Sequence, residues 1–316
     1  MNPCGNMLHF LATKCGLHLF NKYLKMDAKL LFYLKSVWIP PGHDIVKFPE
    51  VSKLKLLLMS NCRIQQDFTK KMLESCHSLQ KLALLGCILN PEILKKICRQ
   101  NGQSLQVLEL ARSSTIQTQK NPMYKDGLDP DNEYGYLDFE TIQTIMGCCP
   151  ELTGFTLLNN NLSKTSINYL VNRLPSKIEI LFLGGLEHVK DDHVKILVSR
   201  LKKLKNLDLS DTGITGKSLD SIIEYAKENL VTLNIAHTSK IKLSKFLELK
   251  SLTNLKYLCC DGCLKSGEIK ILENKLPNLS IKDTTDIMCE VGDEMHTFEE
   301  AFKDCKGLRT LKLERL

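Results

Sequence analysis

The sequence repeats a short leucine pattern at a nearly constant interval. The clearest copy begins at Leu204, ends at Thr212 and reads Leu-Lys-Asn-Leu-Asp-Leu-Ser-Asp-Thr. Its first, fourth and sixth positions are apolar, and its ninth position holds a small polar residue. The same pattern begins 26 residues earlier at Ile178 and 26 residues later at Leu230. A fixed period of this length predicts a solenoid, in which each repeat is one structural unit stacked on the next.

About ten copies of the pattern share this register. Their first positions are Leu54, Leu79, Leu105, Leu152, Ile178, Leu204, Leu230, Leu255, Leu276 and Leu308. Most successive starts are 25 or 26 residues apart, but Leu105 and Leu152 are separated by 47 residues. We interpret this longer interval as one ordinary repeat plus an insertion of 21 residues, placed near residues 114–140.

Each unit predicts a short strand followed by a helix. In the strand, the second and third apolar positions of the pattern share one face, and the residues between them share the other face. Between the strands the apolar spacing becomes helical, as at residues 93–97, 167–174 and 219–226. Asn90-Pro91-Glu92, Ser163 to Ser166, Asp191-Asp192 and Thr215 to Ser218 are expected as caps or first turns of the helices. The predicted fold is therefore an α/β leucine-rich-repeat solenoid shaped like a horseshoe, with parallel strands on the concave face and helices on the convex face.

The 13 cysteines follow the repeat frame rather than a disulfide framework. Cys62, Cys87 and Cys263 occupy ninth positions, and Cys76 and Cys149 precede a repeat by three residues. Free cysteine behaves as a small buried hydrophobe, and abundant reduced cysteine suits the cytoplasm or the nucleus. Residues 1–20 carry no basic segment before their brief apolar stretch, so we expect no signal peptide.

These cysteine-containing repeats resemble those of the F-box/LRR family, which includes S-phase kinase-associated F-box proteins. The resemblance covers residues 51–316 and rests on the period, on the cysteine positions and on segments such as Ile145–Leu152 and Leu79–Cys87. It implies a protein-binding solenoid that presents a substrate to an SCF-type (cullin) ubiquitin ligase, within proteasomal protein degradation. Relatives that resemble antagonist of mitotic exit network proteins share the repeats but lack the F-box, so a free-standing scaffold or regulator is the alternative.

Residues 1–50 depart from the family pattern. An F-box opens with a Leu-Pro pair and closes near a tryptophan, but this segment contains no Leu-Pro, and only Trp38 answers to the pattern. We interpret residues 1–50 as a helical cap, a degenerate repeat or an F-box relic. At the other end, the last unit stops at Leu316 without a polar cap. Either the natural chain continues, or a partner covers the final strand.

The third, fifth and seventh positions of each unit are expected on the concave face, where a protein partner would bind. In the first half of the chain these positions are unusually apolar for a solvent-facing surface, which favours an interaction role. Residues 1–50 folding over the first strands would be an alternative explanation. The candidate contact residues are Leu56, Leu58, Leu85, Leu158, Ile180, Phe182, Asn206, Asp208, Asn234 and Tyr257.

The insertion is the second candidate contact region. Long loops in compact repeat arrays are often functional, and this one is rich in acidic and aromatic residues, including Tyr124, Tyr134 and Tyr136. Its Asp129-x-Asp131-x-Glu133 segment imitates a calcium loop, but Tyr134 occupies the position that requires glycine. We therefore expect no metal at this loop.

Other site chemistry is sparse. The repeat frame explains Cys260 and Cys263 as structural, so Cys259-Cys260-x-x-Cys263 does not predict zinc. The sequence has no phosphate-binding or dinucleotide motif. Its net charge of +7 is spread over helices and loops, and only 6% of the residues are aromatic, which argues against nucleic-acid binding. No apolar run reaches the length of a membrane span. We expect no enzyme activity and no cofactor.

Overall fold

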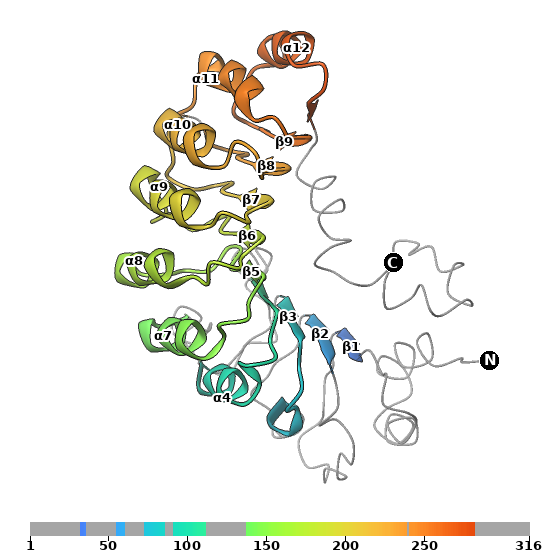
Figure 1. Cartoon of the computed structure of the whole chain (residues 1–316), viewed down its shortest axis with the longest axis vertical. Helices are drawn as coiled ribbons and strands as arrows, with labels where there is room; N and C mark the ends of the chain where they lie inside the picture. Colours follow the sequence, from blue (N-terminus) through green and yellow to red (C-terminus); the bar gives the residue numbers. More distant parts are fainter. Residues whose placement is uncertain are drawn as a thin grey trace, which may run out of the picture.

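The strands form one parallel sheet that follows the order of the sequence. The computed structural model describes residues 32–35, 55–60, 73–85, 91–111, 137–238 and 240–281. Ten strands pair successively from β1 to β10, and every pair is parallel. Figure 1 shows them on the inner side of an arc, with the helices on the outer side. The predicted solenoid is therefore confirmed.

The strands are two to five residues long and stay in register with the sequence repeat. Phe155, for example, pairs with Leu181, and Leu181 pairs with Leu207, each 26 residues further along the chain. The strand bounds are β1 Phe32–Lys35, β2 Leu56–Ser60, β3 Lys81–Leu85, β4 Val107–Ala111, β5 Gly154–Thr156, β6 Ile180–Phe182, β7 Asn206–Asp208, β8 Thr232–Asn234, β9 Tyr257–Cys259 and β10 Ser280–Ile281.

The helices lie between consecutive strands and pack side by side along the outer face (Figure 1). Their apolar stripes match the helical spacing in the sequence, so each helix buries one side against the sheet. The helix bounds are α4 Pro91–Asn101, α7 Phe139–Cys148, α8 Lys164–Arg173, α9 Asp191–Arg200, α10 Gly216–Tyr225, α11 Leu243–Glu248, the 3₁₀ helix η3 Leu249–Ser251 and α12 Ser266–Lys275.

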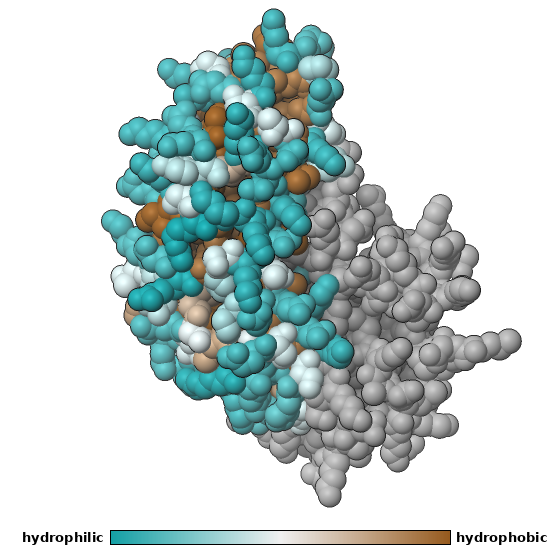
Figure 2. All heavy atoms as spheres, in the orientation of Figure 1, coloured by the Kyte–Doolittle hydropathy of each residue, from teal (hydrophilic) through white to brown (hydrophobic). Residues whose placement is uncertain are grey.

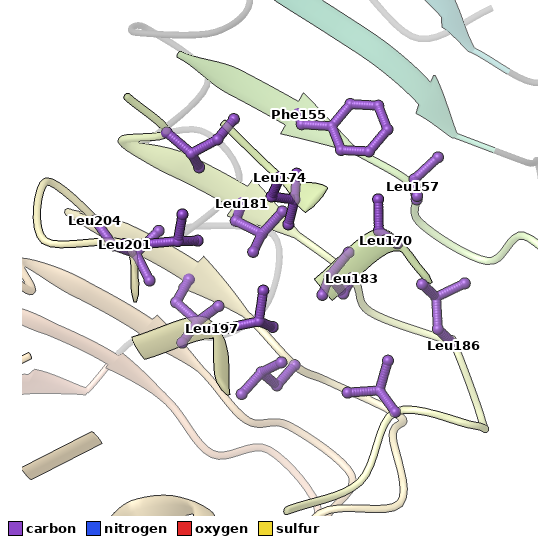
Figure 3. Packing of buried hydrophobic residues seen from close by; sticks show 14 of the residues in the cluster. Phe155, Leu157, Leu170, Leu174, Leu181, Leu183, Leu186, Leu197, Leu201 and Leu204 are labelled. Carbon is purple, nitrogen blue, oxygen red and sulfur yellow. The ribbon is translucent and has the colours of Figure 1, made fainter. Parts of the chain in front are cut away.

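The core lies between the sheet and the helices. Apolar residues at the fourth and sixth positions, most of them leucine, face the helices, and Leu181 and Leu183 are fully buried there. Figure 3 shows them beside Leu170 of α8 and Leu197 of α9. One strand and one helix cannot cover the sides of their own apolar face, so each repeat needs its two neighbours to bury its core residues. Over the face that Figure 2 displays, hydrophilic residues dominate and hydrophobic ones show between the repeats.

The expected helix starts are confirmed where the structure describes them. Ser163 caps α8 and accepts a hydrogen bond from the Ser166 amide at 3.1 Å, and Thr215 caps α10 by accepting from the Lys217 amide at 3.3 Å. α9 begins at Asp191, whose charge suits the positive end of the helix dipole. These caps satisfy amide groups that have no partner inside the helix.

A second hydrogen-bond layer joins α9 to α10. The Asp191 carboxylate accepts from the Thr215 amide at 2.8 Å, from the Thr215 hydroxyl at 2.7 Å and from the Ser218 hydroxyl at 2.6 Å. Partial burial raises the pKa of Asp191, but the hydrogen bonds from Ser218 and Thr215 outweigh that effect and lower it below its ordinary value. The first turn of one helix is thus fastened to the first turn of the next.

His193 makes the corresponding link from α9 back to α8. Its Nδ1 accepts a hydrogen bond from the Lys190 amide at 3.0 Å, and its Nε2–H donates to Asn168 Oδ1 at 2.8 Å. Both contacts need the neutral ring, with the proton on Nε2. Burial lowers the pKa of His193, which favours this same neutral form.

The ninth position of the pattern satisfies carbonyl groups where the chain leaves the sheet. The hydroxyl of Thr212 donates to the Leu209 carbonyl at 2.5 Å, and the hydroxyl of Thr238 donates to the Ile235 carbonyl at 2.6 Å. Cys263 fills the same position and donates from Sγ to the Ile235 carbonyl at 3.0 Å. Cys260 is buried in the core. The repeat frame therefore accounts for both cysteines, as predicted.

The eighth position has a left-handed backbone in five successive repeats. The residues are Asn159, Gly185, Asp211, His237 and Gly262, with φ between 52° and 76°. Only glycine fits at Gly185 without displacement, because a Cβ there would lie 2.2 Å from Asn159 Oδ1. The amides of Asn159, Gly185, Asp211 and His237 each donate to a carbonyl of the following repeat, at 2.6–2.9 Å. This turn therefore extends the parallel ladder beyond the strands.

Two elements lie at the edges of the segments that the sequence left open. Residues 32–35, within the segment interpreted as a helical cap, a degenerate repeat or an F-box relic, form β1, which pairs with β2 one repeat later. α7 begins at Phe139, inside the stretch near 114–140 assigned to the insertion. The rest of residues 1–50, the units beginning at Leu54 and Leu308 in part or in full, and residues 112–136 lie outside the described part of the chain.

Candidate protein-interaction surface

The concave face is built from the third, fifth and seventh positions of successive repeats, as predicted. Parallel strands are about 4.8 Å apart, so side chains at equal positions form rows that cross the sheet. One row runs through Val107, Gly154, Ile180, Asn206 and Thr232, and the next contains Glu109, Thr156, Phe182, Asp208 and Asn234. The structure therefore brings together predicted contact residues that are far apart in the sequence, such as Ile180, Asn206 and Asn234.

Five of these concave side chains form a second apolar cluster, separate from the main core. Val107, Ile180, Phe182, Ala236 and Cys259 are buried together, and Leu158 and Tyr257 pack against them while remaining partly exposed. The cluster spans the sheet from β4 to β9. We call these seven residues the concave cluster.

The concave cluster is more deeply buried than a solvent-facing surface. We expected exposed positions, but Ile180 is 7% exposed and Phe182 is 4% exposed. In a closely spaced ladder each side chain is flanked by two neighbours in its own row and two along its own strand, which reduces its accessible area. Leu158 and Tyr257 are therefore the members of the cluster that an incoming side chain reaches first.

A polar network adjoins the cluster on β7 and β8. Asp208 Oδ1 accepts from the Ser210 amide at 2.8 Å and from the Ser210 hydroxyl at 2.6 Å, and Asp208 Oδ2 accepts from Asn234 Nδ2 at 3.0 Å. Asn234 Oδ1 in turn accepts from the Ala236 amide at 3.0 Å. Burial raises the pKa of Asp208, and the hydrogen bonds from Ser210 and Asn234 oppose that rise. The network fixes these side chains in one arrangement.

Glu109 is a buried carboxyl group in the same row as Phe182. It is 2% exposed, and burial raises its pKa to about 7, although the charge of Lys81 acts in the opposite direction. An ionised carboxylate is costly to bury. Near neutral pH the concave face therefore contains a group that gains or loses a proton readily.

The other predicted contact residues are placed only in part. Leu56 and Leu58 lie on β2 and Leu85 lies on β3, but their side chains are outside the described part of the chain. Tyr124, Tyr134 and Tyr136 of the insertion also lie outside it. Glu140, which stands at the twelfth place of a calcium loop that would start at Asp129, is paired with Lys95 at 2.8 Å.

Sequence reasoning missed Ala236 as a member of the concave cluster. Alanine is too common to stand out, but the frame that begins at Leu230 puts this residue at a seventh position. It also missed the left-handed eighth position. The signal was present there, since asparagine, glycine and aspartate dominate that column and tolerate φ above zero best.

The described residues contain no group of three or more histidine, cysteine or acidic side chains able to hold a metal ion. None of the helices in the described ranges is long and apolar enough to cross a membrane.

Comparison with known proteins bears on the fold. No protein-family model matches the sequence. A chain of the crystal structure of the yeast complex of Rad7 and Elc1 superposes with a TM-score of 0.50 and 19% sequence identity. The match covers 75% of this chain and 63% of that one, so this chain spans less than two thirds of its neighbour's length. This chain is a leucine-rich-repeat solenoid. At this identity the likeness concerns the fold alone.

Proposed function

We propose that the chain is a non-catalytic protein-binding solenoid, and that it serves as the substrate-recognition subunit of an SCF-type (cullin) ubiquitin ligase. The observation that carries the binding role is the concave cluster, an apolar group that spans β4 to β9 beside a fixed polar network. An apolar centre with ordered polar groups around it is the usual make-up of a protein interface. A substrate-recognition role of this kind would be carried out in the cytoplasm or the nucleus.

The ligase link is supported by the resemblance of the repeats to the F-box/LRR family. The related fold of a chain in the Rad7–Elc1 complex adds that a solenoid of this kind can be part of an assembly with a second protein. The partners proposed for this chain are a protein substrate on the concave face and the cullin adaptor near residues 1–50.

A free-standing scaffold or regulator is the second candidate function. The observation that favours it is the absence of a Leu-Pro pair from residues 1–50, where the family's adaptor-binding F-box would begin. β1 also lies in this segment and belongs to the repeat sheet rather than to a separate helical module.

Affinity purification of the full chain from cells, followed by mass spectrometry, separates the two functions. Recovery of the cullin adaptor, lost on deletion of residues 1–31, would support the ligase role. Reproducible recovery of a different protein without the adaptor would favour the scaffold.

Substitution of partly exposed concave residues tests the binding surface itself. Leu158→Asp with Tyr257→Asp should weaken capture of the recovered partner while the thermal transition stays within a few degrees of the original. Phe182→Asp should lose binding and folding together, because its side chain is buried. Ile271→Asp is the control, since Ile271 is 45% exposed on α12. Unchanged capture by the Leu158/Tyr257 variant would place the partner elsewhere.

A further inference from the structure

A groove lies on one edge of the solenoid, where the chain passes from the carboxyl ends of the helices into the strands. It measures about 480 Å³ and spans the entries to β6, β7, β8 and β9. Four lysines and two glutamates line it, so its charge is positive. It is formed by residues just before the strands and is distinct from the concave cluster, whose members lie on the strands and immediately after them.

The residues just before four successive strands contain one ion pair and one lysine without an acidic neighbour. Glu179, Lys205, Val231 and Lys256 stand one residue before β6, β7, β8 and β9, and Lys205 pairs with Glu179 at 2.7 Å. Val231 is apolar, so this row places no acid on the strand next to Lys256, whose amide donates to the Val231 carbonyl at 2.9 Å. Among the described residues, Lys256 makes no ion pair.

Two more lysines enter the groove from the end of α9. The Lys202 ammonium group lies over the ring of Tyr225, 5.3 Å from its centroid, which is a cation–π contact. Lys203 is exposed and has no ion pair among the described residues. Asn229 Nδ2 donates to the Lys202 carbonyl at 2.8 Å and fastens this wall to the following repeat. Among the residues that line the groove, three lysines (Lys202, Lys203 and Lys256) have no ion pair with a carboxylate. Apart from Glu179, which is paired with Lys205, Glu228 is the acidic residue in this lining.

We propose that this groove, which we call the lysine groove, docks an extended acidic peptide segment of a partner protein. Neighbouring strands are about 4.8 Å apart, so Lys202 and Lys203, which precede β7, and Lys256, which precedes β9, are separated by roughly 10 Å along the stack. A peptide in the extended polyproline II conformation rises about 3.1 Å per residue with three residues per turn, so every third side chain lies on the same face, about 9 Å from the last. A segment in this conformation with an aspartate or glutamate at every third position therefore matches the spacing of these lysines.

The lining favours separate carboxylates over a continuous chain of phosphates. Arginine, whose planar fork suits phosphate, is missing from the described residues that line the groove. Glu228 and Glu179 would repel an unbroken polyanion more strongly than a segment whose carboxylates are spaced three residues apart.

A fluorescent peptide with glutamate at every third position and glycine or serine elsewhere tests the proposal by anisotropy with the full chain. Reversal of the three lysines, Lys202→Glu, Lys203→Glu and Lys256→Glu, should weaken binding by about tenfold or more. The matched control reverses Lys164, Lys195 and Lys217, which are exposed on α8, α9 and α10. The control should change binding by less than about twofold.

Additional measurements distinguish specific docking in the lysine groove from general charge attraction and from binding of other anions. Binding should weaken as salt is added, since exposed charges are screened over about 8 Å at physiological ionic strength. The Leu158/Tyr257 variant should bind the peptide normally, so failure of the concave face would not affect this result. Equal loss in both lysine triples would indicate general charge attraction and overturn the proposal. So would absence of binding, or tighter binding of a phosphoserine peptide or of a single-stranded oligonucleotide of equal length.

Discussion

Single polar side chains hold neighbouring repeats together at defined points. Asp191 reaches from α9 to residues 24 and 27 positions later, and His193 reaches back 25 positions to Asn168. Asn101 also joins two repeats, since its Nδ2 donates to the Cys76 carbonyl at 2.9 Å and its Oδ1 accepts from the Leu79 amide at 2.9 Å. Each contact spans about one repeat, from 22 to 27 residues, so each one joins neighbouring repeats rather than stabilising a single repeat.

Replacing Asp191 with alanine should lower the free energy of unfolding by about 1–3 kcal/mol at neutral pH, because three donors lose their acceptor. The lowered pKa means that this stabilisation is complete above the ordinary value near 4 and is lost as the pH falls below it. Urea denaturation measures the change. Asp192→Ala is the matched control, because Asp192 is exposed in the same helical turn. An equal loss in both variants would assign the effect to the helix dipole.

His193 should make stability depend on pH in the mildly acidic range. Its pKa is lower in the folded chain than the ordinary value of 6.5, so the unfolded chain binds more protons there. Stability should therefore be complete above pH 6.5 and should fall as the pH drops below it. His193→Ala should cost about 1–2 kcal/mol at pH 7 and flatten this dependence. His188→Gln, at an exposed histidine, should leave the slope unchanged; a steep slope in His193→Ala would contradict the assignment.

The hydrogen-bond partners of single side chains were the least predictable feature of the structure. The Asp191-Asp192 pair predicted a helix start, and α9 begins there. Nothing in the pair distinguishes the member that accepts three hydrogen bonds from the next repeat, because that depends on the angle between α9 and α10. The sequence shows His193 directly after Asp191 and Asp192, but it does not indicate the hydrogen bonds that His193 makes with Lys190 and Asn168.

Each strand contributes to both the core and the candidate surface, because one of its faces packs against the helices and the other forms the concave face. The alternation within each strand predicted correctly which side chains face the helices and which face the concave side. It did not predict how deeply the second group is buried, because that depends on the side chains of two neighbouring strands. Glu109 on β4 shows the difference, since an acidic residue at a concave position reads as solvated but is 2% exposed.

Replacing Glu109 with glutamine should stabilise the chain at high pH. The folded-state pKa of about 7 lies above the ordinary value of 4.5, so stability is lost as the pH rises through 7. We expect Glu109→Gln to exceed the original by roughly 1–3 kcal/mol at pH 8 and to match it near pH 4, below the ordinary pKa.

Denaturation curves at these two pH values, with Glu228→Gln as an exposed control, decide the point. An original chain that is as stable as Glu109→Gln at pH 8 would show that the Glu109 charge is compensated in the folded state.

The whole molecule is a linear stack, and its stability should be distributed accordingly. Each described repeat pairs its strand with the strands of adjacent repeats, and helix packing follows the same order. The fold was predictable from the sequence because each copy of the repeat independently predicts that its strand pairs with the strands of the repeats before and after it. The insertion interrupts the period at Ser113, and from there to α7 the sequence offers no register to extend.

A core deletion in the middle of the stack should therefore act mainly on its neighbours. Leu207→Ala, at a buried position of β7, should cost about 2–5 kcal/mol. Hydrogen exchange should show the largest loss of protection at β6, β7 and β8 and a smaller loss at β4. Ile271→Ala, on the exposed side of α12, should leave the pattern unchanged. A uniform loss over all strands would instead indicate one cooperative unit.

The recurring left-handed turn has a consequence for how such a chain can diversify. Its backbone demand is met by asparagine, glycine, aspartate and histidine alike, and the side chains of Asn159, Asp211 and His237 stand exposed along one border of the sheet. Mutation can exchange these residues among the few types that tolerate the turn without disturbing the leucines beneath. Substitutions along this border can therefore change the surface charge and the hydrogen-bonding groups of one repeat at a time, while the buried leucines and the fold stay the same.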